Sequence, residues 1–185
     1  MQRRDLVDLV LLGAIWGASF LFMRVAVPSF GAVALVEVRM LVGGLFLLPL
    51  LALRGGLGAL RAHAGRIAVV GVLNSTAPFL LITYAMLTLT TAMGSVLNAT
   101  VPMWTALVAA LWLREPPRPA QWLGLAVGAA GVLLLVGDRL DFDRAGPGWR
   151  ETVAIGAALL GMLFYGVSAN VARRTLAGVP TLATA

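Results

Sequence analysis

Apolar residues gather along this chain into long runs that are separated by short polar segments. Six runs are long enough to cross a bilayer as helices, because the hydrocarbon core requires about 20 mostly apolar residues. They cover residues 6–23, 32–53, 67–89, 92–113, 119–137 and 152–172. Transmembrane strands show alternating patterns of about ten residues instead, and no such alternation is visible here. The pattern predicts an all-α polytopic membrane protein with six transmembrane helices.

The connections between these runs are mostly short. The turns around Pro28 and at residues 89–91 hold few polar residues, which predicts tight hairpins between neighbouring helices. The longest polar segment is residues 138–151, where Gly146, Pro147 and Gly148 interrupt any helix. We therefore expect a linker there, between a unit at residues 1–137 and a second unit that begins at residue 152.

The composition supports a membrane environment. Hydrophobic residues make up 60% of the 185-residue chain and charged residues only 12%, whereas soluble domains carry about 25% charged residues. So few charges would leave large apolar patches facing water. An ordinary soluble enzyme, a disordered chain and a coiled coil are all excluded.

The net charge of +6 is better explained by membrane topology than by nucleic-acid binding. All 14 basic residues are arginines, and they lie between the apolar runs instead of forming a basic stripe, so no nucleic acid partner is expected. With the N-terminus in the cytoplasm, nine arginines fall on the inner side and four on the outer side, with Arg39 inside a span. The positive-inside rule therefore predicts a cytoplasmic N-terminus in a multi-pass protein of the plasma membrane.

The residues of common active sites are missing from the spans. The chain has no cysteine and one histidine, His63, which lies in a short polar segment. Ser19, Ser95 and Ser168 have no intramembrane histidine or lysine to activate them. No GxxxxGK[ST] phosphate loop is present. We expect neither an enzyme nor a bound metal or cofactor.

The chain matches itself weakly at an offset of 149 residues. LLGAIWGASFLFMR, residues 11–24, aligns with LGMLFYGVSANVAR, residues 160–173, so that Trp16 meets Tyr165. Identical pairs are Leu11 with Leu160, Gly17 with Gly166, Ser19 with Ser168 and Arg24 with Arg173. A repeat of five spans inverts on duplication, and inverted repeats recur in transporters whose substrate sites lie where the repeats meet.

Five sequence features stand out along the first five spans: GAIWG in the first span, Arg39 in the second, TYAMLTLTTA around the turn after the third, Pro102 in the fourth, and Glu115 followed by QWLG. Together they resemble the EamA family of the drug/metabolite transporter superfamily. The resemblance implies a ten-helix exporter made of two five-helix repeats. Residues 1–137 would form the first EamA repeat, residues 138–151 an outside linker, and residues 152–185 the truncated start of the second, inverted repeat.

The function that the resemblance implies is secondary transport. The expected activity is export of small metabolites, such as amino acids or drugs, across the bacterial inner membrane by alternating access. The expected partners are the small-molecule substrate and the lipid bilayer. A non-transporting or incomplete membrane subunit is an alternative, and a membrane-embedded enzyme is a weaker one. If the chain is truly this short, a homodimer is a further option, although an extra sixth span fits that option poorly.

Two ionisable residues lie inside the second span. Charged groups within spans are costly and point to function. Glu37 and Arg39 are two residues apart and so do not face each other on a helix. Both lie near one end of the span, so snorkelling to the interface is an equal alternative. The resemblance favours Arg39 for a role in the cavity and leaves Glu37 as a candidate for ion coupling.

Uncharged polar residues in the third and fourth spans indicate a central cavity. Asn74 and Thr76 precede Pro78, and Ser95 and Asn98 precede Pro102. Proline breaks the backbone hydrogen-bond ladder, which lipid tolerates where the backbone is satisfied by neighbours or lines a water-filled cavity. Hydrogen bonding between helices is the alternative role for such residues. The predicted cavity set is Trp16, Ser19, Arg39, Asn74, Thr76, Tyr84, Ser95 and Asn98, with helix kinks at Pro78 and Pro102.

Glycine pairs spaced four apart predict where helices pack closely. Gly13 and Gly17 lie in the first span, and Gly124 and Gly128 in the fifth. Small residues at this spacing allow close approach between transmembrane helices. We expect both faces to contact other helices.

Overall fold

The computed structural model describes residues 3–140 and 148–184, and within these ranges the chain is helical, without strands. Six of its helices are long and apolar enough to cross a membrane. The elements are α1 (Arg3–Phe30), α2 (Ala32–Leu53), α3 (Leu57–Ala62), α4 (Ala64–Gly71), η1 (Val72–Thr76), α5 (Ala77–Ala85), α6 (Thr91–Asn98), α7 (Val101–Trp112), α8 (Pro119–Val136), η2 (Gly137–Arg139), α9 (Trp149–Thr175) and α10 (Thr181–Thr184). The predicted all-α class and the six candidate spans are confirmed.

The first predicted hairpin is present, with its turn three residues beyond Pro28. We expected a turn around Pro28, but α1 continues through Pro28 to Phe30, and the chain reverses at Gly31. Gly31 has φ of 73°, a conformation that costs glycine little, and its N–H donates to the Val27 carbonyl at 2.8 Å. The predicted linker breakers Gly146 and Pro147 lie outside the described residues.

The third and fourth spans are each interrupted near the middle. The third consists of α4, the π-helical turn η1 and α5. Pro78 follows η1, and the N–H of Ala77 donates five residues back to the Val72 carbonyl. The ring of a proline clashes with the carbonyl four residues earlier, here that of Asn74, and a widened turn accommodates it. In the fourth span, α6 ends at Asn98 and α7 begins at Val101.

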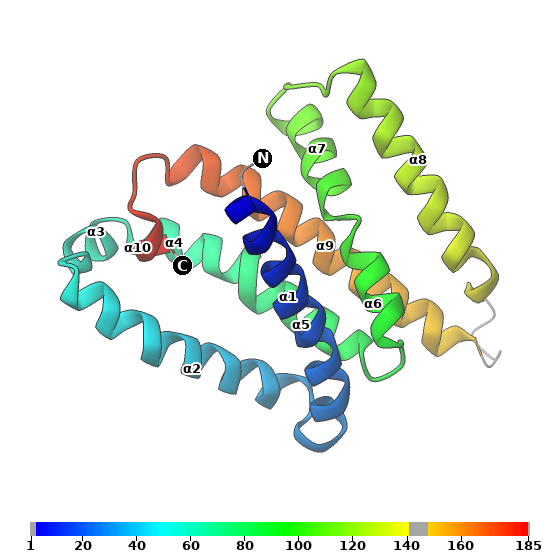
Figure 1. Cartoon of the computed structure of the whole chain (residues 1–185), viewed down its shortest axis with the longest axis horizontal. Helices are drawn as coiled ribbons and strands as arrows, with labels where there is room; N and C mark the ends of the chain where they lie inside the picture. Colours follow the sequence, from blue (N-terminus) through cyan, green and yellow to red (C-terminus); the bar gives the residue numbers. More distant parts are fainter. Residues whose placement is uncertain (1–2, 141–147, 185) are drawn as a thin grey trace.

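Helix α9 runs through the middle of the bundle, with its main contacts to α5 and α7 on its two sides (Figure 1). The helices α1 and α2 pack on each other and on α5, and α8 lies at the periphery beyond α7. Gly161 and Gly166 of α9 allow the close approach: a Cβ at Gly161 would lie 3.3 Å from the Pro78 carbonyl oxygen. The sixth span is thus the helix around which the described bundle is arranged.

The predicted glycine faces are not the ones that bring helices together. Ideal Cβ atoms at Gly13, Gly17 and Gly124 meet no other atom within 4 Å, and at Gly128 only the Met103 sulfur is near, at 3.8 Å. The expectation of close packing there is wrong for this structure. Spacing alone cannot tell which face of a glycine-rich helix meets a neighbour, because both faces offer small residues.

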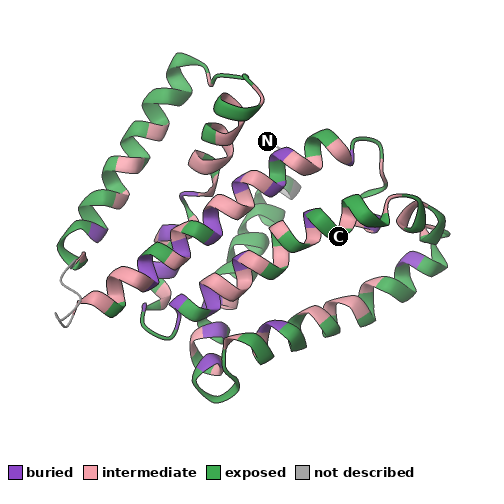
Figure 2. Cartoon of the chain, turned by 180° about the vertical axis from the view of Figure 1, so that it is seen from behind, coloured by how far each residue is buried: buried purple, intermediate pink, exposed green. Residues whose placement is uncertain are grey.

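The apolar core is concentrated at one end of the bundle. Figure 2 shows buried residues gathered where α1 and α5 end and where α6 and α9 begin. The core comprises Phe20, Met23, Val27, Ile82, Ala85, Met86, Leu89, Met93, Leu97, Val136, Ala154, Ile155, Ala158 and Met162. Arg24 donates to the Met86 carbonyl at the same end. The opposite halves of α1 and α2 carry exposed apolar side chains, as expected for helices that face lipid.

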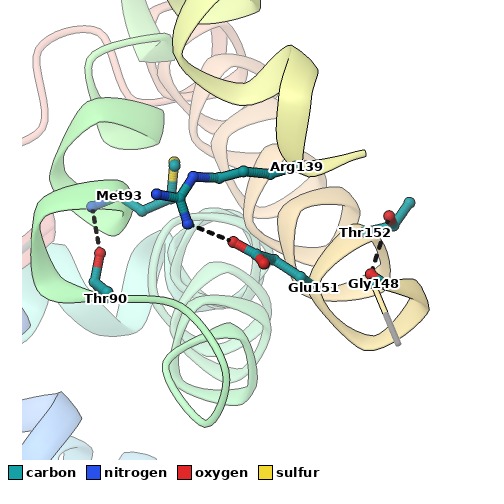
Figure 3. Close-up of polar contacts among 6 residues, drawn as sticks. All are labelled: Thr90, Met93, Arg139, Gly148, Glu151 and Thr152. Atoms are coloured by element: carbon teal, nitrogen blue, oxygen red, sulfur yellow. Dashed lines mark hydrogen bonds and ion pairs between the residues drawn. The ribbon is translucent and has the colours of Figure 1, made fainter. Parts of the chain in front are cut away.

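Polar contacts close this packed end. Arg139 of η2 forms an ion pair with Glu151 in the first turn of α9, with Nη1 of Arg139 3.0 Å from Oε1 of Glu151 (Figure 3). Thr90 caps α6, since its hydroxyl accepts from the Met93 N–H at 3.2 Å. At the other end of α9, Arg173 pairs with Glu115 at 2.6 Å. Both ends of the central helix are therefore joined to the α7–α8 part of the chain.

Candidate functional site

A cavity of about 710 Å³ lies in the middle of the bundle, next to the apolar core. Its walls come from α1, α2, η1, α5, the α6–α7 break and α9. The lining residues are Trp16, Ser19, Phe20, Met23, Arg39, Asn74, Ser75, Phe79, Ile82, Asn98, Ala99, Val101, Pro102, Tyr165 and Ala169. Elements that are far apart in the sequence thus meet around one cavity.

The two helix interruptions supply the cavity's amide side chains. Asn74 belongs to the π-helical turn and Asn98 ends α6, and both line the cavity. A π-turn inserts an extra residue into the helix and is frequent at functional sites. At the break after Asn98, the Ala99 N–H donates to the Ser95 carbonyl and the Thr100 N–H to the Leu97 carbonyl. The two interruptions therefore place two amide side chains beside the cavity.

Arg39 supplies the positive charge of the cavity wall. Its guanidinium donates to the Ser19 hydroxyl at 3.2 Å. The central carbon of the guanidinium also lies 3.9 Å from the centre of the Phe79 ring, a cation–π contact. The Phe79 ring meets Tyr165 edge to face, with centroids 6.3 Å apart and planes at 85°. Residues of α1, α2, α5 and α9 thus hold one cation in place.

The remaining wall is largely apolar. Phe20, Met23 and Ile82 continue the core into the cavity, and no acidic side chain is among the described lining residues. Glu37 is exposed and lies on a different face of α2 from Arg39. In the part of the chain that the structure describes, no cluster of three or more metal-binding side chains is present.

The structure brings together part of the predicted cavity set. Trp16, Ser19, Arg39, Asn74 and Asn98 line one cavity, as does the kink residue Pro102. Their role in binding a substrate stays a prediction.

Four other predicted residues do not line the described cavity. Thr76 and Tyr84 are exposed away from it. Ser95 donates to the Thr91 carbonyl of its own helix at 3.0 Å. Pro78 is buried, and its carbonyl faces Gly161 of α9.

Tyr165 and Phe79 are two of the cavity residues that were missed from the sequence. Tyr165 aligns with Trp16 in the internal match, so the repeat itself carried a signal for it. Phe79 carried none, because a phenylalanine in an apolar span is indistinguishable from one that faces lipid or packs in the core. Its position beside Arg39 emerges only when α2 and α5 are placed together.

Comparison with known proteins gives a family match. The sequence profile of the EamA-like transporter family matches residues 7–137. The curated relatives include the protein named "Uncharacterized inner membrane transporter YedA" in Escherichia coli strains K12, O6:H1 and O157:H7. Each is 32% identical over 141 residues, which cover 73% of this chain and 45% of the relative. The chain thus spans less than half the length of these relatives. No solved structure matches the chain.

Proposed function

Because this chain belongs to the EamA-like transporter family, we propose that its central cavity is the substrate site of a secondary transporter of small metabolites. The observation that carries the proposal is the cavity of about 710 Å³, lined at two helix interruptions by Asn74 and Asn98. Transporter sites typically lie near the bilayer midplane where discontinuous helices meet. The substrates we propose are small solutes such as amino acids or drugs, and the direction is export.

The proposed location is the bacterial inner membrane, with a cytoplasmic N-terminus. The relatives are named as inner membrane transporters, and the arginine bias sets the orientation. In this orientation the packed end of the bundle, with Phe20, Met86 and Leu97 in its core, lies on the outer side. The chain would then be closed to the outside, and the alternating-access cycle would open this packed end.

We further propose that the chain contains an inverted repeat. Residues 1–137 would form one five-helix repeat, residues 138–151 a linker on the outside, and residues 152–185 the start of the second repeat. Two facts support this division: the family match ends at residue 137, and the aligned residues Trp16 and Tyr165 both line the cavity. Equivalent residues at a shared site are what an inverted repeat requires.

The alternatives make different demands on the same chain. A non-transporting subunit would leave the cavity residues without effect on flux. A homodimer would place a second copy against the described helices and would appear as a dimer in solution. A membrane-embedded enzyme would require reactive groups that the described cavity wall does not contain.

The proposal is tested by flux measurements in proteoliposomes with a panel of radiolabelled amino acids. We expect the wild-type chain to carry at least one of them, and Asn74→Ala and Asn98→Ala each to reduce that flux several-fold. Thr88→Ala is the matched control, because Thr88 is an exposed polar residue in the α5–α6 turn, away from the cavity. Unchanged flux in both asparagine variants would contradict the cavity assignment.

A further inference from the structure

The cavity has one strong electrostatic feature, which is the guanidinium of Arg39. No acidic side chain is among the described lining residues, and no ion pair to Arg39 occurs within the described ranges. Its described polar partner is the neutral hydroxyl of Ser19. A guanidinium carries five N–H donors in a planar fork that matches a carboxylate. The described cavity wall therefore contains a positive charge and no negative side chain to balance it.

The depth of Arg39 argues against a merely interfacial role. Arg39 lies seven residues from the start of α2, or about 10 Å along the helix axis. Ser19 lies eleven residues from the end of α1 at the same side of the bundle, or about 16 Å along its axis. The guanidinium hydrogen-bonds Ser19 and so extends deeper into the bundle. A snorkelling arginine would extend toward the nearer interface instead.

The surroundings of Arg39 hold the guanidinium in a defined orientation. The central carbon of the guanidinium lies 3.9 Å from the centre of the Phe79 ring, and Tyr165 packs edge to face against Phe79. In the described contacts one guanidinium nitrogen donates, to Ser19, which leaves other N–H donors for a ligand. Bonds from arginine to a carboxylate are stronger than bonds between neutral groups. A preorganised donor also binds with a smaller loss of side-chain entropy.

We propose that Arg39 binds the carboxylate of the transported solute, so that the cavity selects small carboxylate-bearing solutes with an apolar body. The inference rests on the proposed transport function and names the substrate class of the same site. Phe20, Met23 and Ile82 supply the apolar surface for the rest of the solute. An amine of the same shape that carries no carboxylate is rejected, because its charge would approach the guanidinium without an acidic partner in the described wall. A neutral amide of the same shape binds through its apolar body alone.

Three probes of similar shape separate the effect of ligand charge on binding from the effect of ligand shape. Phenylacetate, phenylacetamide and phenethylammonium differ mainly in the charge of their polar end. Their binding is measured with labelled probes on the chain in phosphatidylcholine nanodiscs, with empty nanodiscs subtracted to remove partitioning into lipid. We expect phenylacetate to bind roughly tenfold more tightly than phenylacetamide, as a hydrogen bond to a charged group allows. Phenethylammonium binds more weakly than both.

Variants of the same helices assign the preference to Arg39. Arg39→Gln should remove the difference between phenylacetate and phenylacetamide and leave phenylacetamide binding unchanged, which also shows that the variant is folded. Phe79→Leu should weaken phenylacetate binding several-fold and retain the preference for the anion. Arg54→Gln is the control, because it removes one positive charge just beyond the end of α2, outside the cavity.

The outcomes distinguish the two proposals. Equal binding of all three probes by the wild type, or an anion preference that survives in Arg39→Gln, overturns the assignment of Arg39 and leaves the cavity in place. Binding of none of the probes above empty nanodiscs, together with no flux in the amino acid panel, overturns both the transport function and the charge selection.

Discussion

Gly166 of α9 lies directly against the backbone of Trp104 in α7. A Cβ atom at Gly166 would be 2.7 Å from the Trp104 carbonyl carbon and 2.8 Å from the nitrogen of Thr105. Backbone atoms cannot move aside as a flexible side chain can. Close contact at this point places the cavity-lining part of α9, with Tyr165 and Ala169, beside the break in the fourth span.

Gly166→Ala is therefore expected to destabilise the bundle. The added methyl group must separate α7 from α9, and overpacking of this kind costs about 1–3 kcal/mol. The effect is measured as the melting temperature of the detergent-solubilised chain, with size-exclusion chromatography as the readout. Gly17→Ala is the matched control, since Gly17 aligns with Gly166 in the repeat but has open space around it. Equal melting temperatures for the two variants would contradict the packing described here.

A second contact joins the same two helices through a buried amide. The side-chain nitrogen of Asn170 donates to the Thr105 carbonyl at 3.0 Å and to the Gly166 carbonyl of its own helix at 2.8 Å. Asn170 is 3% exposed. Asn170→Ala should destabilise the chain by about 0.6 kcal/mol and by no more than about 2 kcal/mol, as measured for bonds between transmembrane helices.

Thr175→Ala separates this effect from a general loss of polar bonds in α9. The Thr175 hydroxyl donates to the Val171 carbonyl within its own helix at 2.8 Å, so its side chain makes no described bond to another helix. We expect thermal unfolding of Thr175→Ala to match the wild type. If it loses as much stability as Asn170→Ala, the bond to Thr105 is not what stabilises the α7–α9 contact.

The number and extent of the spans could be predicted because length and apolarity are properties of a single segment. Residues 32–53 form α2 with those same bounds. Asn74 and Asn98 were also found in advance, because a proline shortly after polar residues marks a helix interruption within one span. These features depend on local chemistry, and no neighbour is needed to reveal them.

Contacts between spans could not be predicted in the same way. Gly13, Gly17 and Gly124 had the spacing of a packing face, yet the close contacts are made by Gly161 and Gly166. In lipid, hydrophobicity does not distinguish a buried face from an exposed one, since the surrounding chains are as apolar as leucine. The contact of Arg39 with Phe79 could not be predicted for the same reason, because it joins side chains from two different helices.

The proposed orientation makes a prediction about accessibility. The chain has no cysteine, so single cysteines can be labelled without background. Thr88 lies in the turn between α5 and α6, and Ala62 ends α3 at the opposite end of the third span. In intact cells, a membrane-impermeant maleimide should label Thr88→Cys and should label Ala62→Cys only after lysis. The reverse labelling pattern would place the N-terminus outside.

We expect Pro78 to set the rotation of the upstream half of the third span. With alanine there, the new N–H could bond the Asn74 carbonyl, and the π-turn at Val72–Thr76 could revert to an α-helix. Removing the extra residue of that turn rotates the preceding segment by about 100°. Asn74 would turn away from the cavity, and Pro78→Ala should lower flux several-fold while leaving stability unchanged or raised.

The rotation itself can be measured through the rate at which a cysteine in place of Asn74 reacts with a small methanethiosulfonate reagent. The rate should fall several-fold when Pro78→Ala is combined with Asn74→Cys. Pro28→Ala is the control, because Pro28 lies in the last turn of α1, outside the cavity. An unchanged reaction rate in the Pro78 variant would mean that α9 holds the π-turn in place. Gly161 of α9 packs against the Pro78 carbonyl and would then be the determinant of the π-turn.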